Sequence, residues 1–547
     1  MLTTDVPTTF DWPKSPYKGL SYYGPSDVPL FAGRERAVRR CAEQLTNRNT
    51  RLLILHGPTG CGKSSFLRAG LIPFLEGQNG RYQFARQLDG ASPEALFVRS
   101  TDAPLKALAA ELYKFVTSAV FETEDGPEKL DSNAVLLGCE SAAEFVEKAG
   151  NSADQLIASL AGVATEWPRS LALVVDQGEE VLTLKSERDA DAEKARNQFF
   201  DFVFKFNKTD FDLKLIIALR TEYFGKFTAR MGRSLRDLNR VEIFYLDVLT
   251  EPEIAEAIER PTSKKDLHGR PYDHYQFEFA DTLPGQIAGD VLNNKNIKGG
   301  VLPVVQIICE NLYWAGKTLH PKEPFTITVA DYQALPPVEA QLEGYLKQKL
   351  EAFGESKRII VSEFEVDRWK DVLSGLSTKQ IDGTVVTQLA DIDHLRKLAR
   401  KAGCRLPFAD TMRYLADPEV RVLRGEEIVD SRTNIPVMAY SLGHDAIGLV
   451  MEDWKSVKEA TARSVRTMRL AYRVAGCGML TLAAALVFFR GYGFTSLAFL
   501  GLVLYGGATL VMGFIPSDYF RRLFAPLVLR SQRHFRMQAG RRAQSRP

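Results

Sequence analysis

LLILHGPTGCGKSS, Leu52–Ser65, is the stretch that decides the fold of this chain. Its first four residues are apolar and predict a short buried strand. The glycines that follow lead into Lys63 and Ser64, where we expect a helix to begin. This is the pattern G-x-x-x-x-G-K-[ST] between a strand and a helix, and in that context it predicts a loop that binds nucleotide phosphates.

The residue types of this loop suit a phosphate ligand. Glycine allows the tight turns that point backbone N–H groups at phosphate oxygens, and the N-terminus of the next helix adds partial positive charge. Lys63 would reach the β- and γ-phosphates, and the Ser64 hydroxyl would bind Mg²⁺. A glycine-rich turn that binds nothing is the alternative, which the complete motif disfavours. The predicted nucleotide-binding residues of the loop are Gly57, Gly60, Gly62, Lys63, Ser64 and Ser65.

A second apolar run, Leu171–Val175, ends in the carboxylate of Asp176. Ligands bind at the carboxyl ends of parallel strands, so we expect Asp176 to orient Mg²⁺ together with Ser64. Glu179 or Glu180 would then polarise the attacking water. The alternative is an acidic surface turn, and the phosphate-binding loop upstream favours the functional interpretation.

A third apolar run, Leu213–Leu219, ends in Arg220. A guanidinium group at that strand end could contact the γ-phosphate and act as a sensor during catalysis. A salt bridge to a neighbouring carboxylate such as Asp176 or Glu222 is the alternative. The position of Arg220 favours the sensor role.

Composition narrows the functional class only a little. The chain has 547 residues, enough for several domains, and its formal net charge of +2 indicates no particular partner. Its six scattered cysteines contain no C-x-x-C pair, which argues against a disulfide framework or a zinc site and fits a reducing compartment. The polar N-terminal residues show no secretory signal.

Apolar periodicity and local signals divide the chain into successive domains. Thr250 and Glu253 form a capping box that opens a helical region. Further on, Glu427–Val429 and Val437–Leu442 predict a hairpin after several helices, which favours a winged-helix-like domain. The predicted order is a leader (1–30), an α/β P-loop NTPase core with a parallel sheet (31–249), a helical domain (250–352), a winged-helix-like domain (353–450), a basic linker helix (451–473), two transmembrane helices (474–516) and an Arg-rich tail (517–547).

The transmembrane prediction comes from two uncharged runs, Val474–Phe489 and Phe494–Ile515. A transmembrane helix needs about 20 apolar residues, so we expect a helical hairpin in the lipid bilayer. Residues 521–547 carry eight arginines and no acidic residue, and arginines also precede the first run. The positive-inside rule then places the NTPase domains and the tail in the cytoplasm and the chain in the plasma (inner) membrane as a multi-pass protein. A buried soluble hairpin is the alternative, and we expect no specific nucleic-acid binding.

The motifs, in this order, resemble the STAND class of signal-transducing P-loop ATPases, and most closely its first novel subgroup. The resemblance covers about 16–455. The segments that carry it are PYKGL (Pro16–Leu20), LFAGRE (Leu30–Glu35), GPTGCGKSS, LALVVDQGEE, ALRTEYFGKF, GGVLPVVQ (Gly299–Gln306), ITVADYQAL (Ile327–Leu335) and YSLGHDAI (Tyr440–Ile447).

This resemblance implies further contacts to a bound nucleotide. Arg34 would contact the adenosine part, Pro303 would pack against it from the helical domain, and His444 would contact the phosphates of ADP in a resting state. A hydrogen-bonded core histidine is the alternative for His444. The chain departs from the family at Gly178, where phenylalanine is common, and in carrying a C-terminal hairpin in place of long repeats.

Together these features predict a membrane-anchored, ATP-dependent signalling switch that uses Mg²⁺. ADP would hold the domains closed at rest. An unknown trigger would allow exchange for ATP, opening and homo-oligomerisation, and slow hydrolysis would reset the switch. A role in defence or stress, with the membrane as output, fits this scheme. Two alternatives stay open: a constitutive membrane-tethered ATPase that remodels a partner, and a nucleotide-bound scaffold that does not hydrolyse.

Overall fold

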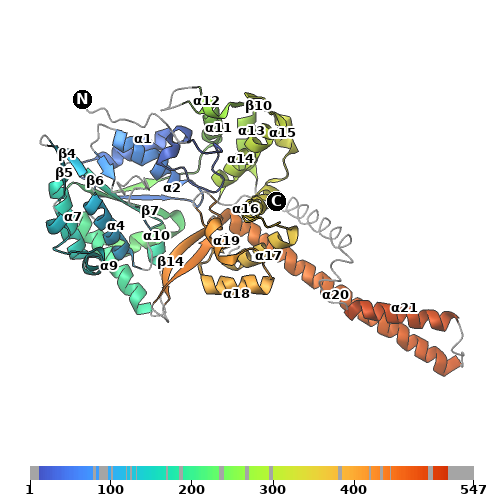
Figure 1. Ribbon diagram of the computed structural model, residues 1–547. Coiled ribbons are helices and arrows are strands. Elements are labelled where there is room, and N and C mark those ends of the chain that lie inside the picture. The colour runs from blue at the N-terminus through green and yellow to red at the C-terminus, as the bar shows by residue number, and fades with distance from the viewer. Residues whose placement is uncertain are drawn as a thin grey trace. The chain divides into compact units, whose positions relative to one another are not determined.

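The computed structural model consists of two compact units, Met1–Val450 and Met451–Pro547 (Figure 1). Each unit is described by itself below. The residues that the structure describes are 12–77, 82–84, 97–99, 103–118, 120–123, 126–130, 132–167, 170–183, 189–232, 240–264, 270–294, 300–379, 385–417, 420–430, 435–443, 445–490 and 497–514.

The first unit is built on a six-stranded sheet, and every described strand pair in it is parallel. The strand order is β2-β6-β7-β1-β8, and β3 also pairs with β6. This confirms the predicted α/β class with a parallel sheet. The strands are β1 (Leu52–Gly57), β2 (Tyr82–Phe84), β3 (Phe97–Arg99), β6 (Ser170–Asp176), β7 (Leu213–Arg220) and β8 (Val241–Tyr245).

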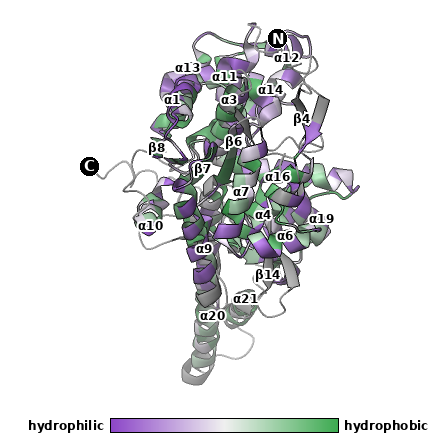
Figure 2. Ribbon diagram, turned by 90° about the vertical axis from the view of Figure 1, so that its left-hand side faces the viewer, coloured by the Kyte–Doolittle hydropathy of each residue, from purple (hydrophilic) through white to green (hydrophobic). Residues whose placement is uncertain are grey.

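Helices cover this sheet, which explains why its central strands read as unbroken apolar runs. Residues of β1, β6 and β7 are almost all buried, and Figure 2 shows β6 and β7 in the hydrophobic colour. The helices of this part are α1 (Glu35–Thr46), α2 (Lys63–Ser65), η2 (Phe66–Leu71), α3 (Ile72–Gly77), α4 (Pro104–Ser118), α5 (Ser132–Val135), α6 (Ala142–Ala149), α7 (Ala153–Glu166), α8 (Glu180–Thr183), α9 (Asp189–Asn207) and α10 (Thr221–Met231), and a hairpin joins β4 (Val120–Thr123) to β5 (Gly126–Lys129).

The strand order decides which side chains meet at the carboxyl edge. Strand β7 lies between β1 and β6, and its register pairs Arg220 with Gly57 at the start of the phosphate-binding loop. On its other side, Ile217 pairs with Val175, one residue before Asp176. The three apolar runs therefore end side by side, as expected for a site at one edge of a parallel sheet.

A helical module follows the sheet. Its first helix begins with the predicted capping box, in which the Thr250 N–H donates to Glu253 Oε2 at 2.8 Å. The two short parallel strands that it also contains were not predicted. Its elements are α11 (Glu251–Glu259), η4 (Arg260–Thr262), α12 (Pro271–Tyr275), β9 (Phe277–Phe279), α13 (Leu283–Asn293), α14 (Val301–Leu319), β10 (Phe325–Ile327), α15 (Val329–Ala334) and α16 (Val338–Ser356).

A third module, defined here as residues 357–450, packs three helices with a three-stranded antiparallel sheet of order β13-β15-β14. The predicted hairpin is confirmed as β14 and β15, although Thr433-Asn434 between its strands lie outside the described residues. The winged-helix label stays a prediction. The elements are α17 (Glu363–Leu373), η5 (Ser374–Leu376), β11 (Ser377–Lys379), β12 (Val385–Thr387), β13 (Ala390–Asp391), α18 (Ile392–Ala402), α19 (Phe408–Leu415), β14 (Leu423–Asp430) and β15 (Ile435–Leu442).

The leader is more than an irregular extension. Its only described helix is η1 (Pro25–Leu30), but Tyr17, Leu20 and Tyr23 are buried in the first unit. The Tyr17 hydroxyl donates to the carbonyl of Ile258 at 2.6 Å. We call residues 16–24 the leader segment.

The second unit contains two helices, of which α20 (Asp445–Arg490) already begins before its boundary and α21 is Leu497–Phe514. The predicted basic linker helix and the first predicted span are therefore one continuous helix. The two helices approach closely at glycines: a Cβ on Gly476 would lie 2.7 Å from the Leu510 backbone nitrogen, and one on Gly506 would lie 2.9 Å from Met479 Cβ. These pairs make the hairpin antiparallel.

The prediction of two transmembrane helices is not supported. Within the described part of the chain, the structure has no helix of the length and apolar character that crossing a membrane requires. The prediction was made from the lack of charge in the two runs, and residues 494–496 and 515 of the second run lie outside the described residues. The Arg-rich tail, 517–547, lies outside the described residues. Bilayer contact thus lacks support, and the inner-membrane location stays a prediction.

We predict that Gly178→Ala destabilises the first unit. A Cβ on Gly178 would lie 2.7 Å from Ile217 Cγ2, and Ile217 is fully buried in β7. Overpacking of this kind costs about 1–3 kcal/mol. The thermal unfolding midpoint of the full chain measures the effect. Gly285→Ala, in α13 with nothing within 4 Å, is the matched control and should be neutral or stabilising. Equal midpoints for the two variants would contradict the prediction.

Candidate nucleotide-binding site

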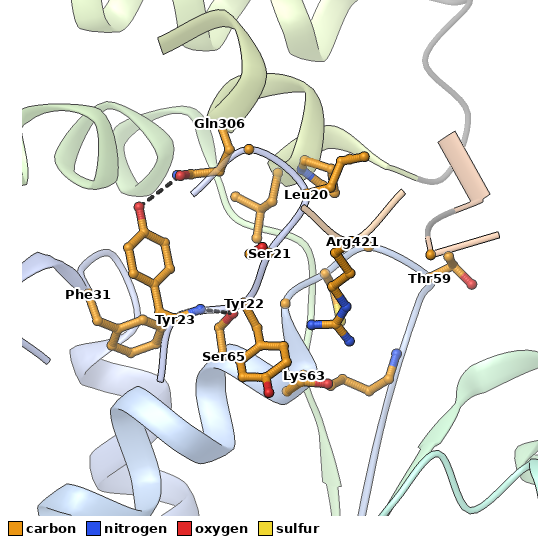
Figure 3. Close-up of a pocket in the computed structure, with 18 of the residues that line it drawn as sticks. Leu20, Ser21, Tyr22, Tyr23, Phe31, Thr59, Lys63, Ser65, Gln306 and Arg421 are labelled. Carbon is orange, nitrogen blue, oxygen red and sulfur yellow. Dashed lines mark hydrogen bonds between the residues drawn. The ribbon is translucent and has the colours of Figure 1, made fainter. Parts of the chain in front are cut away.

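A pocket lies at the carboxyl edge of the sheet and contains about 1180 Å³ of empty space, the part open to solvent included. Its lining comes from the leader segment, the sheet, the helical module and the third module (Figure 3). The lining includes Tyr22, Tyr23, Leu30, Phe31, Ala32, Arg34, Gly60, Gly62, Lys63, Ser64, Ser65, Asp176, Glu179, Arg220, Leu249, Ala257, Leu302, Pro303, Gln306, Arg421 and Arg424.

The phosphate-binding loop has the backbone that its glycines allow. Gly60 and Gly62 have φ angles of 75° and 87°, a region that other residues rarely adopt. Gly57 packs against the chain just after β8, since a Cβ there would lie 2.4 Å from the Leu246 carbonyl oxygen. Lys63 Nζ donates to the carbonyls of Gly57 and Pro58 at 2.9 and 3.0 Å. The lysine is therefore held over the loop in the place where the motif needs its charge.

The side chains of Ser64 and Asp176 meet at the phosphate-binding loop. The Ser64 hydroxyl donates to Asp176 Oδ2 at 2.8 Å, and the Gln177 N–H donates to Asp176 Oδ1 at 3.0 Å. Mg²⁺ prefers oxygen ligands and is usually bound by one or two protein groups together with phosphates and water. Ser64 and Asp176 fit that requirement and are the residues that would hold Mg²⁺ here.

The turn after Asp176 directs one glutamate into the pocket. Gln177 has a φ of 59°, which is uncommon for a non-glycine residue, and the Gly178 N–H donates to the Ala218 carbonyl of β7 at 2.7 Å. Glu179 is consequently 7% exposed and lines the pocket. Glu180 begins α8 and is not among the described lining residues, so the geometry selects Glu179 of the two candidates.

Arg220 forms an ion pair with Glu179. Its Nε donates to Glu179 Oε1 at 3.1 Å, and its backbone N–H donates to Oε2 at 3.2 Å. The alternative of a salt bridge is thus realised in the structure, with Glu179 in place of the expected Asp176 or Glu222. Because Arg220 also lines the pocket, the pair does not exclude a γ-phosphate contact.

Arg34 is hydrogen-bonded to the phosphate-binding loop. It is 6% exposed, and its Nη2 donates to the Cys61 carbonyl at 2.7 Å. Burial lowers the pKa of its guanidinium group, while the nearby Cys61 thiol and Glu253 act in the opposite direction. This hydrogen bond joins Arg34 to the phosphate-binding loop, and its predicted contact to adenosine stays a prediction.

Part of the pocket lining is apolar. Pro303, at the start of α14, belongs to it, and its predicted packing against adenosine stays a prediction. Neighbouring side chains come from the core and the helical module, and together they offer the kind of surface on which a purine ring packs. They are Leu30, Phe31, Ala32, Leu249, Ala257 and Leu302.

The sequence analysis missed the contributions of the leader segment and of the third module. Figure 3 shows Tyr23, whose N–H donates to Ser65 Oγ at 3.1 Å and whose hydroxyl donates to Gln306 Oε1 at 2.8 Å. Arg421 reaches the same pocket from the third module. The aromatic residues of the leader could have indicated in the sequence that this segment is buried, whereas no sequence pattern marked Arg421. His444 lies outside the described residues, so its predicted phosphate contact stays a prediction.

A family model described as novel STAND NTPase 1 matches residues 16–475, the part that contains all of these motifs. No curated protein matched. Among solved structures, the chain is similar to the Aeropyrum pernix ORC2 protein (ADPNP-ADP complexes), with a TM-score of 0.33, 12% identity and coverage of 78% of this chain and 95% of that one. It is also similar to a chain of the E. coli MS115-1 HORMA:CdnC:Trip13 complex (TM-score 0.32, 9% identity, coverage 57% and 92%). Structural likenesses this weak support no argument about function.

We predict that Ser64→Ala removes the dependence of nucleotide binding on Mg²⁺. The wild-type chain should bind ADP roughly tenfold more tightly with Mg²⁺ than with EDTA, and the variant should bind with the lower affinity in both buffers. Isothermal titration calorimetry measures both constants. Lys63→Ala is the comparison, since it should weaken binding in either buffer. A Ser64→Ala chain that keeps the full Mg²⁺ effect would contradict the proposed ligand pair.

Proposed function

The chain belongs to the novel STAND NTPase 1 family, as its motifs predicted, and from this premise we propose that it is an ATP-dependent signalling switch. ADP holds the first unit in a closed resting state, and exchange for ATP opens it and allows homo-oligomerisation. Hydrolysis then returns it slowly to rest. From the family we infer a role in defence or stress signalling.

One observation carries this proposal: a single pocket takes its lining from the sheet, the helical module, the third module and the leader segment. A nucleotide bound there would contact several modules of the first unit at once. A ligand shifts a conformational equilibrium only if it binds the two states with different affinity. A site assembled from separate modules meets that condition, because opening the modules removes part of the site.

The Arg220–Glu179 ion pair supports slow hydrolysis. Glu179 is the carboxylate placed to polarise water, but both of its oxygens accept hydrogen bonds from Arg220. These bonds occupy acceptor positions on Glu179 that would otherwise orient the attacking water. A γ-phosphate offers the guanidinium group a second anionic partner, so ATP, unlike ADP, would compete with Glu179 for Arg220.

The experiment compares nucleotide content and mass. The purified wild-type chain should carry ADP, which mass spectrometry of the released nucleotide identifies. Light scattering should then show a monomer with Mg²⁺ and ADP and a larger species with Mg²⁺ and a non-hydrolysable ATP analogue. Glu179→Gln should form the larger species with ATP itself and keep it, because the γ-phosphate is no longer removed.

Lys63→Ala is the control for Glu179→Gln and should show no nucleotide-dependent change of mass. Steady turnover by the isolated wild-type chain, with one mass in all nucleotides, would overturn the switch and favour a constitutive ATPase. A mass change that needs Lys63 but is the same in ATP for the wild type and Glu179→Gln would favour the scaffold that does not hydrolyse.

A further inference from the structure

Arg421 is an arginine of the third module that points into the nucleotide pocket. It precedes β14 and is 8% exposed, which is low for a charged side chain. Figure 3 shows its guanidinium group directed at the same part of the pocket as Lys63. Nothing in the sequence pattern of the family motifs assigned it a role.

The backbone at Arg421 is built for one conformation. Its φ is 47°, which non-glycine residues seldom adopt and which costs conformational energy. Its N–H donates to the Asp417 carbonyl at 2.8 Å, and a Cβ on Gly443 would lie 1.9 Å from its carbonyl oxygen. The neighbouring Val420 carbonyl accepts from the Tyr345 hydroxyl at 3.0 Å. The surrounding chain therefore fixes the direction in which Arg421 leaves the backbone.

The side chain of Arg421 is also fixed, by the ring of Tyr22. Its Cζ lies 4.3 Å from the ring centroid, and the Cζ of Arg68 lies 4.5 Å from the same centroid. Both distances are within the range of a cation–π contact. Arg68 belongs to η2, the continuation of the helix that begins at Lys63. The Tyr22 ring thus joins the third module to the helix of the phosphate-binding loop.

The excess of positive charge in the pocket lining favours binding of an anion. Its described lining contains five cationic side chains and two carboxylates, and one of the carboxylates, Glu179, is already paired with Arg220. Bringing like charges together is unfavourable unless an anion lies between them. The cations are Arg34, Lys63, Arg220, Arg421 and Arg424, and the carboxylates are Asp176 and Glu179.

We propose that Arg421 is a phosphate-binding residue that the third module contributes to the nucleotide site, and that Tyr22 positions it. The proposal rests on the proposed function, because it names how the closed state recognises its nucleotide. Lys63 marks the position of the β-phosphate, so Arg421 contacts that phosphate and not the α-phosphate. Binding of ADP then draws the third module onto the pocket, and AMP does not.

The test compares the affinities of ADP and AMP in the full chain by competition against a fluorescent nucleotide. Arg421→Asn removes the charge with a residue that tolerates a positive φ. We expect its ADP affinity to fall roughly tenfold or more, as for loss of one charge-assisted contact, with AMP affinity unchanged. Arg421→Lys, which keeps the charge, should recover part of the loss. Arg413→Asn, which removes an arginine with 80% exposure from the same module, is the control and should change neither affinity.

Each outcome decides one question. An unchanged ADP affinity in Arg421→Asn overturns the proposal. An equal fall in ADP and AMP affinity also overturns it, because a merely structural role would move both. The proposed function fails separately, if the wild-type chain does not bind ADP or binds it equally well after Lys63→Ala.

Discussion

The leader segment contacts the helical module, the helix that follows the phosphate-binding loop and the third module, and the arrangement of these parts depends on it. Tyr17 donates to the carbonyl of Ile258 in the helical module, Tyr23 bonds to both Ser65 and Gln306, and Tyr22 lies against Arg421 of the third module. These contacts are spread over seven consecutive residues, a short tether that cannot keep all of them if the modules move apart. In the proposed switch, the exposure of this segment would therefore report whether the pocket is closed.

The candidate catalytic residues line the same pocket that the modules of the first unit share. The carboxyl edge of a parallel sheet supplies the loop, the Ser64–Asp176 pair and the Glu179–Arg220 pair, all of them buried or partly buried. Burial strengthens interactions between these charges and a phosphate ligand, because water screens them less. In the proposed switch, the extra phosphate of ATP would therefore compete for these cations, and the modules that share them would respond together.

How much the sequence could reveal follows from where each residue lies. Residues next to a strand end, such as Lys63 and Asp176, are placed by local pattern, because parallel strands align their carboxyl ends. The partner of Arg220 could not be chosen, since that required the turn formed by Gln177 and its positive φ. The role of Arg421 could not be predicted, because its position depends on contacts with residues far away in the chain. The transmembrane prediction was made from the lack of charge in the two C-terminal runs, and the described helices do not support it.

The most direct measurement of the central claim is hydrogen–deuterium exchange of residues 16–24 in the full chain, with Mg²⁺ and either ADP or a non-hydrolysable ATP analogue. Fully buried residues of β1 serve as an internal reference that should stay protected with both nucleotides. The account predicts slow exchange of the leader segment with ADP and clearly faster exchange with the ATP analogue, because opening breaks its contacts to the modules. Equal exchange with the two nucleotides would contradict it.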